Sequence, residues 1–244
     1  MDETPETTGR NPFSSRGFVL SAAFVVALIA AAILLAVLPR PTGPRAEPIP
    51  LPTPKPTSSA SQAGTEPSVC GLPASDDTAL GAAPDSSWEL VGTMAVPTSP
   101  KIHGPGDVDD TGFRSCFAHS PTGALYAAAN IWGTGFYGDA ERLYRDLAAD
   151  SPTRDAALSA IDEGKEISNS AAPKIQIRGF IIKHYEEGSA VIDLGIETAD
   201  GALGTLPTPL VWEGGDWKLN LPQTGQTGIK QLATLNGYIS WSGV

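Results

Sequence analysis

The stretch that decides the fold is residues 173–197, with the sequence PKIQIRGFIIKHYEEGSAVIDLGIE. Apolar and polar residues alternate along it, and this period of two predicts β-strands that are buried on one face. The parity of the apolar residues slips by one at Gly179, which predicts a β-bulge. Glu186, Glu187 and Gly188 predict a turn into a second strand. In that strand the apolar residues are in phase: Ala190, Ile192, Leu194 and Ile196.

Toward the C-terminus the chain continues as a β-meander. Two short apolar runs, 210–212 and 217–221, flank Gly214 and Gly215, and this arrangement predicts a hairpin. The last stretch, 227–244, is ambiguous. The spacing of its apolar residues suits a short helix: Ile229, Leu232 and Leu235.

On the N-terminal side of the deciding stretch the apolar period is 3.6, which is typical of helices. Ser120-Pro121 and Ser151-Pro152 each combine an N-cap residue with a first-turn proline, and Asp139 is a third capping residue. We therefore expect three helices between residues 120 and 164.

Glycines and apolar residues suggest the ends and the buried faces of these helices. We expect the first helix to end at Gly133 and Gly135 and the third to end near Gly164. The expected apolar faces are Leu125 with Ala128 or Ala129 and Trp132, then Leu143 with Leu147, then Ala157, Leu158 and Ile161.

Before the helices, residues 88–96 predict a first strand that Pro97 and Pro100 stop, and residues 113–118 are apolar and β-prone. Helices followed by long antiparallel strands are the order of an α+β domain. We expect the helices to pack on a curved antiparallel sheet in a domain that spans residues 88–244.

The N-terminal region contains residues 17–38, GFVLSAAFVVALIAAAILLAVL, without a charge. A helix of this length rises about 33 Å, enough to cross a hydrocarbon core of about 30 Å. The alternative is a cleaved secretion signal, whose apolar region is usually shorter, roughly 7–15 residues, and precedes a small-residue cleavage site. This run ends instead in the sequence LPRP at 38–41, so we expect a retained transmembrane helix.

The flanking segments are polar. Residues 1–16 form a short tail, and residues 39–87 form a spacer that holds nine prolines between Pro39 and Pro67. Proline fixes φ and removes a backbone donor, so the spacer is expected to be extended and semi-rigid. A disordered linker without a length requirement is the equal alternative.

Cysteine usage bears on the orientation, because the Lys and Arg residues on the two sides of the apolar run are nearly balanced. The chain has two cysteines, Cys70 and Cys116, which predict one disulfide worth about 4 kcal/mol in the loop-entropy description. Two buried thiols are the alternative. A disulfide requires an oxidising compartment. We therefore expect a single-pass protein of the cell membrane with a cytoplasmic N-terminus and an extracytoplasmic C-terminal domain.

The charge balance excludes one class of partner. From Pro67 onward the chain has 11 Lys and Arg residues against 22 Asp and Glu residues. An acidic surface repels phosphates, so we expect no direct binding of nucleic acid by the outer domain.

The order of elements resembles the nuclear-transport-factor-two-like cone, in which N-terminal helices pack inside a curved antiparallel sheet. The anchor, Pro-rich spacer and single outer domain are similar to the bitopic scaffold proteins of type IV secretion and of Gram-positive conjugative elements, whose outer domain has this cone fold. Residues 117–130, FAHSPTGALYAAAN, also resemble a run in actinobacterial proteins associated with mobile elements. Residues 88–96 and the cysteine pair depart from the minimal cone.

Few side chains suggest chemistry. His119 precedes a helix start, where a histidine can act as a base but more often caps or packs, and His103 and His184 suit surface roles. The three histidines have no metal-ligand spacing. Ser120 lacks the Gly-x-Ser-x-Gly context of a nucleophile.

The acidic and aromatic residues also suggest little chemistry. Asp193 opposes the apolar face of its strand, and some cone enzymes place an acid inside the cone, so Asp193 is the strongest catalytic candidate. The acids at 107–110 lack the Gly and terminal Glu of an EF-hand loop, so Asp107, Asp109 and Asp110 are expected to be solvated. Three tryptophans are expected in the core rather than in a ligand cage: Trp132, Trp212 and Trp217.

These features favour a non-catalytic, membrane-anchored scaffold without cofactor or metal, its cone filled by Leu125, Ile131, Trp132 and their neighbours. The resemblance implies a role in assembling a conjugative or type IV secretion-like DNA transfer system, with other membrane proteins of that apparatus as partners. A homo-oligomer is a further option, because a membrane tether raises local concentration. The alternative function is an anchored accessory or ligand-binding protein of the cell envelope, of the lipid-uptake-associated type, which needs an open pocket.

Overall fold

The computed structural model describes residues 66–164, 174–223 and 228–243. Every described residue belongs to one compact unit of the chain. The predicted tail, the predicted membrane span and the first part of the spacer lie outside the described residues. Within the described ranges, no helix is both long enough and apolar enough to cross a bilayer.

The main elements of the described residues are an antiparallel sheet of six strands and three α-helices, so the α+β class is confirmed. The strand order is β10-β5-β6-β7-β8, and β9 pairs with the start of β7, at Leu203–Thr205, on the same edge as β8. The bounds are Ile175–Glu186 (β5), Ser189–Thr198 (β6), Leu203–Glu213 (β7), Asp216–Leu219 (β8), Lys230–Leu232 (β9) and Ile239–Ser240 (β10).

The predicted hairpin of β5 and β6 is present. A register shift between Ile177 and Gly179 confirms the predicted bulge, and a second shift between Ile182 and His184 adds another irregularity that the sequence pattern did not indicate. The hairpin of β7 and β8 around two glycines is also confirmed. The in-phase residues of β6 are all buried: Ala190, Ile192, Leu194 and Ile196.

β7 is longer than the sequence predicts and includes Pro207 and Pro209. Proline lacks a backbone N–H and is normally confined to sheet edges. The carbonyl of Pro209 accepts a hydrogen bond from Asn220 on the side away from β6, and β8 pairs with β7 only from Leu210 onward. At both prolines the backbone nitrogen, which has no hydrogen, therefore faces away from β6. The ladder between β6 and β7 loses no hydrogen bond.

Residues 88–96 do not form the single strand predicted for them. They form a hairpin of β1 (Ser87–Val91) and β2 (Met94–Thr98), joined by a turn that starts at Gly92. Gly92 has a φ of +59°, a conformation that glycine adopts without steric cost and that two-residue hairpin turns require.

The three predicted helices are α2 (Pro121–Tyr137), α3 (Ala140–Arg142) and α4 (Pro152–Asp162). Each begins as expected, because the side chains of Ser120, Asp139 and Ser151 accept a backbone N–H of the following turn. α3 continues into a π-helical turn, η2 (Leu143–Leu147), in which both leucines are buried. α4 has no fully buried residue, so its apolar residues only partly face the rest of the domain.

The predicted end of α2 is wrong. The helix continues through Gly133 and Gly135 and ends at Tyr137, with Gly138 as its C-cap. A Cβ atom on Gly133 would lie 2.9 Å from Val96 Cγ1 of β2. This glycine therefore allows β2 to approach the helix closely and does not stop it.

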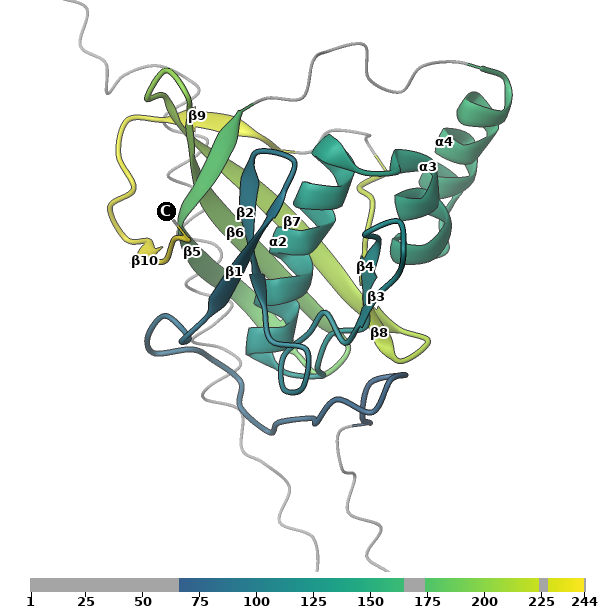
Figure 1. The fold of residues 1–244 in the computed structure, drawn as a ribbon, viewed down its shortest axis with the longest axis horizontal. Helices are drawn as coiled ribbons and strands as arrows, with labels where there is room; N and C mark the ends of the chain where they lie inside the picture. The colour runs from purple at the N-terminus through teal and green to yellow at the C-terminus, as the bar shows by residue number, and fades with distance from the viewer. Residues whose placement is uncertain (1–65, 165–173, 224–227, 244) are drawn as a thin grey trace, which may run out of the picture. The chain divides into compact units, whose positions relative to one another are not determined.

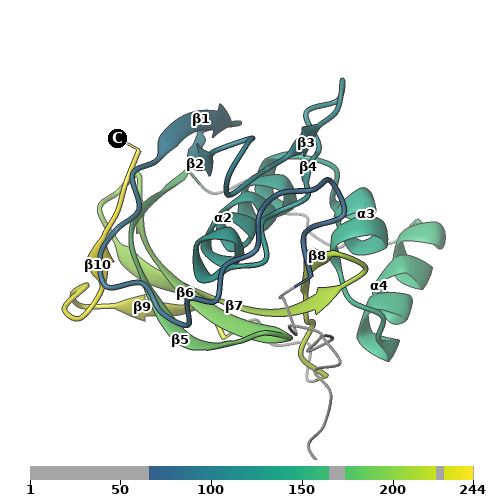
Figure 2. The same ribbon diagram turned by 90° about the horizontal axis from the view of Figure 1, so that it is seen from below.

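α2 lies on the concave side of the curved sheet, and the hairpin of β1 and β2 covers the helix from the other side (Figures 1 and 2). The helix is buried all round from Pro121 to Ile131 rather than on the one face expected. Leu125 and Ile131 are buried as predicted, while Trp132 is partly buried and donates to Thr208 Oγ1 at 2.7 Å. Side chains thus fill the space between α2 and the sheet.

The helix considered for the C-terminal stretch is absent from residues 228–243, which contain β9 and β10 instead. Between these strands the chain crosses the outer face of the sheet. A Cβ atom on Gly195 of β6 would meet Leu235 Cδ2 at 2.8 Å and Tyr238 Cδ1 at 2.9 Å. The apolar spacing of this stretch therefore reflects contacts of an extended segment with the sheet.

Cys70 and Cys116 form the predicted disulfide. Cys116 follows a short hairpin of β3 (Asp107–Val108) and β4 (Arg114–Ser115), and Cys70 lies in the irregular segment before β1. The disulfide therefore ties residues 66–86, which the sequence assigned to the end of the spacer, to the domain immediately before α2.

Candidate functional site

β5 has a strand partner on only part of its outer edge. β10 pairs with β5 at Gly179 and Phe180, and the chain turns away before β10 at Gly237, which has a φ of +90°. In the described part of the chain, no strand pairs with residues 181–186 on the side away from β6. Such an edge presents unpaired backbone N–H and C=O groups that can accept another strand.

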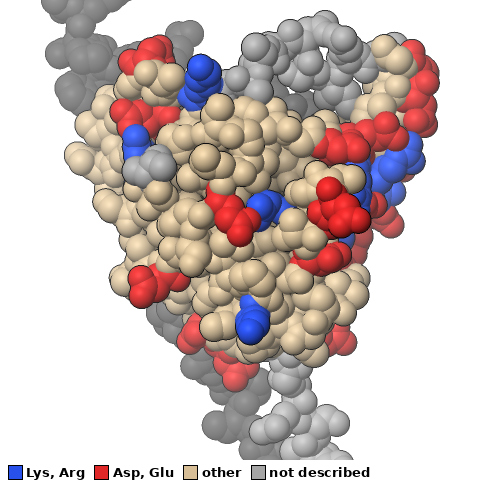
Figure 3. All heavy atoms as spheres, viewed as in Figure 1, with Lys and Arg blue, Asp and Glu red and all other residues tan. Residues whose placement is uncertain are grey.

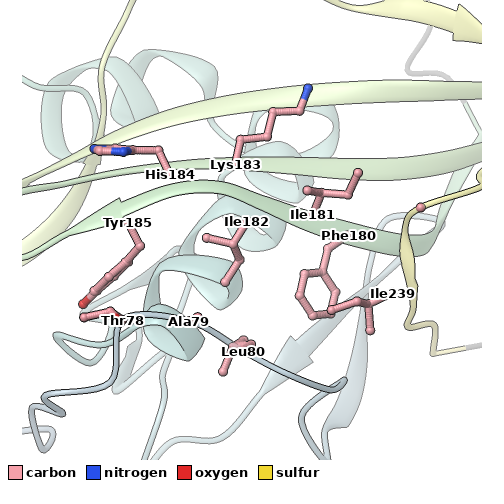
Figure 4. A pocket seen from close by; sticks show the side chains of 11 residues that line it. Thr78, Ala79, Leu80, Phe180, Ile181, Ile182, Lys183, His184, Tyr185 and Ile239 are labelled. Atoms are coloured by element: carbon pink, nitrogen blue, oxygen red, sulfur yellow. The ribbon is translucent and has the colours of Figure 1, made fainter.

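Residues 78–80 lie along this free edge and leave a depression of about 310 Å³, which we call the β5 groove. It is lined by residues 78–80, by residues 180–185 of β5, and by Gly237 and Ile239. Figure 4 shows that Ile182 and Tyr185 point to the side of residues 78–80, whereas Lys183 points to the opposite side of the strand. The side chains of Leu80, Ile182 and Ile239 make the middle of the groove apolar.

One end of the β5 groove is acidic. Burial, followed by the carboxylates of Glu187 and Asp77, raises the pKa of Tyr185 to about 12. The Glu186 carboxylate lies 3.7 Å from His184 Nε2 at the same end. These carboxylates favour a cation beside Tyr185.

Several contacts hold residues 78–80 in place. The disulfide fixes the chain on one side of them, and Ser75 donates its backbone N–H to the carbonyl of His119 at 3.1 Å. On the other side, Ser86 Oγ accepts hydrogen bonds from Tyr126 at 2.7 Å and from Trp241 Nε1 at 3.0 Å. The groove is therefore formed in advance of any partner.

His119 holds two segments of the backbone together beside the groove. It is buried and stacked on Trp212, with ring centroids 3.8 Å apart. Its Nδ1 lies 2.9 Å from the carbonyl oxygen of Glu66, and its Nε2 lies 2.5 Å from that of Glu187. Both ring nitrogens are occupied by the backbone, so His119 does not present a free base to a substrate.

Asp193 lies on the outer face of the sheet, opposite the buried Ile192 and Leu194. It forms an ion pair with Lys183 and accepts a hydrogen bond from the Thr205 hydroxyl. The hydrogen bond that Lys183 donates to the Asp193 carboxylate raises the pKa of Lys183. Asp193 therefore does not lie inside the curved sheet, which is the position expected for a catalytic acid.

The acids of the β3–β4 hairpin do not converge on one point. Asp109 Oδ1 accepts from the backbone and hydroxyl of Thr111 and from the backbone of Phe113, and its Oδ2 pairs with Arg142. The hydrogen bonds from Thr111 and Arg142 lower the pKa of Asp109. Asp107 and Asp110 are exposed, as expected. Across the residues that the structure describes, no group of three or more His, Cys, Asp or Glu side chains could hold a metal ion.

The remaining candidates have packing or capping roles. Ser120 Oγ accepts from the backbone of Gly123 at 3.0 Å, and His103 packs on Tyr126, where burial lowers the pKa of His103. Trp217 is fully buried and donates to the carbonyl of Ala118 at 3.0 Å, and Trp212 is partly buried against the core.

Sequence reasoning missed Asp216, which is 3% exposed. Its carboxylate accepts the backbone N–H groups of Cys116 at 2.7 Å, Phe117 at 2.8 Å and Trp217 at 2.8 Å. The only local signal is an acid directly after the Gly214-Gly215 turn, which resembles any polar hairpin residue. The β5 groove was missed as well, because its sides come from residues about 100 positions apart.

A second surface depression, of about 360 Å³, lies where β5 begins and β6 ends. Several of its polar side chains already have partners. Gln176 bonds to the backbone of Thr93 and Ala95, and Arg178 Nε donates to Glu197 at 2.7 Å. This depression therefore offers fewer free groups than the β5 groove.

Charged side chains are spread unevenly on the surface shown in Figure 3. Acidic and basic groups gather on the side of α3 and α4, and uncharged side chains cover most of the rest of that face. The charges on α3, η2 and α4 form ion pairs, for example between Arg145 and Glu141 at 2.8 Å and between Arg145 and Asp162 at 3.3 Å. On this face the Lys and Arg side chains form no continuous basic patch.

The comparisons with known proteins give a family and no function. No curated protein and no solved structure matches the chain significantly. A family match covers residues 50–240, which includes all of the sheet and the helices. The chain thus belongs to the family described as a domain of unknown function, DUF8175.

Proposed function

We propose that this chain is a single-pass membrane protein whose extracytoplasmic domain binds other proteins without catalysis, as a scaffold of a conjugative or type IV secretion-like DNA transfer apparatus. The main support for protein binding is the β5 groove, in which a free strand edge lies beside residues 78–80. The assignment to DNA transfer rests on the resemblance of the anchor, spacer and outer domain to bitopic scaffold proteins.

The filled interior supports protein binding over small-molecule chemistry. An enzyme or carrier needs convergent polar groups in an apolar cavity. Here the space between α2 and the sheet contains buried side chains, among them Leu125, Tyr126 and Leu194. A curved sheet around a central helix is also what a nuclear-transport-factor-two-like cone requires, and we propose that fold on this basis.

The disulfide supports the extracytoplasmic location, because disulfides persist in oxidising compartments and are rare in the cytosol. Apolar residues 17–38 support the anchor, because their length matches the hydrocarbon core. With this topology, protease added to intact cells cleaves the C-terminal domain. Protection of that domain in intact cells would reverse the topology.

Deletion of the gene tests the proposed function. Transfer of the mobile element that carries the gene should fall in the deletion strain and return when the full-length chain is supplied from a second site. A normal transfer frequency in the deletion strain would exclude the role in DNA transfer.

A further inference from the structure

We propose that the β5 groove receives an extended segment of a partner protein, which pairs with residues 181–186 as an added antiparallel strand and carries a basic residue beside Tyr185. The inference rests on the proposed function and identifies the contact through which it operates. Strand addition combines main-chain hydrogen bonds, which give affinity, with side-chain pockets, which give specificity.

The backbone groups of β5 point the right way for an added strand. Trp241 donates its backbone N–H to the carbonyl of Arg178 at 3.1 Å, so Arg178 faces the β10 side. Alternate residues of a strand face the same edge, so the N–H and C=O of Ile182 also point there, into the groove. Beyond the second register shift, Glu186 pairs with Ser189 to close the hairpin, so the backbone groups of Glu186 face β6. The backbone groups of the preceding residue, Tyr185, therefore face the groove.

The groove also fixes the direction of the added strand. β10 is antiparallel to β5 and covers Gly179 and Phe180 before leaving the edge at Gly237. A segment that continues this pairing runs in the same direction as β10. Its N-terminal end then lies beside Tyr185 and its C-terminal end beside Gly237.

Alternate side chains of such a segment meet an apolar surface. Leu80, Ile182 and Ile239 line the groove on the side to which Ile182 points (Figure 4). Side chains of a strand project to opposite faces with a period of two. The segment that fits therefore has apolar, β-prone residues at every second position and no proline at the positions that donate to Ile182.

The charges around the groove favour a cation at its N-terminal end. Glu187 and Asp77 act on Tyr185 there, and Glu186 lies beside His184. Lys183, the basic residue of this part of β5, is engaged by Asp193 on the other face of the sheet. A Lys or Arg at the start of the segment therefore meets the carboxylates of Glu187 and Asp77, which form no ion pair with another described residue.

A second copy of this chain fits the edge less well than a single extended segment. Two copies joined through β5 would each bring residues 78–80 and the irregularity between Ile182 and His184 to the shared edge. Their acidic domains would also repel each other, since each chain has a net charge of −11.

The test titrates the full-length protein in nanodiscs with a labelled synthetic peptide, Lys-Thr-Val-Thr-Val-Thr-Ile. We expect saturable binding, and about tenfold weaker binding after methylation of the backbone nitrogens on the β5 side, because strand hydrogen bonds are lost. Ala79→Trp fills the groove and should weaken binding about tenfold. Ala82→Trp changes an exposed residue of the same segment outside the groove lining and should leave binding unchanged.

Replacing the peptide lysine by glutamate should weaken binding about threefold, and this difference should vanish in the Asp77→Asn, Glu187→Gln double variant. Absence of saturable binding to folded protein, or equal binding to the Ala79→Trp variant, overturns the inference. So does a dimer that Ala79→Trp abolishes, which would assign the edge to a second copy. Peptide binding with normal transfer in the deletion strain leaves the groove standing and rejects only DNA transfer.

Discussion

Single buried polar residues join parts of this domain that are far apart in the sequence. Asp216, at the start of β8, accepts the backbone N–H groups of Cys116 and Phe117 just before α2. Burial raises the pKa of Asp216, and the backbone hydrogen bonds oppose that shift. His119 likewise connects the carbonyls of Glu66 and Glu187. The polar groups of both side chains therefore hold segments of the chain together.

Asp216→Asn should lower the free energy of unfolding by about 1–3 kcal/mol, because the amide has one acceptor oxygen and leaves a buried N–H unpaired. Urea unfolding followed by tryptophan fluorescence measures the change. Asp110→Asn, at an exposed position, is the matched control and should leave stability unchanged. Equal stability of the two variants would show that the Asp216 hydrogen bonds do not hold the turn to the segment before α2.

Tyr185 should titrate at about pH 12, above the usual 10.0, because burial and then Glu187 and Asp77 disfavour the phenolate. Because the folded protein keeps the Tyr185 proton to a higher pH than the unfolded chain does, the folded state is fully stable with respect to this group below pH 10. It loses stability as the pH rises toward 12. Ultraviolet absorbance, with Tyr185→Phe to assign the signal, measures it. Glu187→Gln should lower the pKa of Tyr185, and an unchanged value would argue against an acidic groove end.

At the scale of elements, the sequence predicts best where one local rule acts alone. The Ser-Pro pairs place the starts of α2 and α4 correctly, and the parity slip places the bulge at Gly179. The end of α2 is missed because Gly133 serves a contact with β2, a partner that the local pattern does not contain. The length of β7 is underestimated because prolines within a run usually argue against a strand. Here they are tolerated because β8 and β9 leave that part of the β7 edge open.

The segment before β1 depends on the disulfide. Replacing both Cys70 and Cys116 by serine should lower the free energy of unfolding by about 2–4 kcal/mol, because a long loop gains freedom in the unfolded chain. It should also weaken peptide binding at the groove, since residues 78–80 lose one of their two fixed ends. Urea unfolding and the peptide titration measure the two effects. Full peptide affinity in the serine variant would show that the groove does not need the disulfide.

For the whole molecule, the sequence gives the α+β class, the disulfide and a filled interior, but not the site. The β5 groove exists because a β10 of two residues leaves most of the β5 edge open and because the chain before β1 returns to lie beside it. Neither residues 78–80 nor residues 181–186 carry a motif. Their meeting depends on long-range pairing, which composition and periodicity do not encode.

The most direct test of the account joins the groove to the proposed function in cells. The deletion strain is supplied with the full-length wild-type chain, with Ala79→Trp or with Ala82→Trp, at matched levels in the membrane. We predict that Ala82→Trp restores element transfer fully, while Ala79→Trp restores it about tenfold less well because its groove is filled. Wild-type transfer with the Ala79→Trp chain would contradict the claim that this protein works through the free edge of β5.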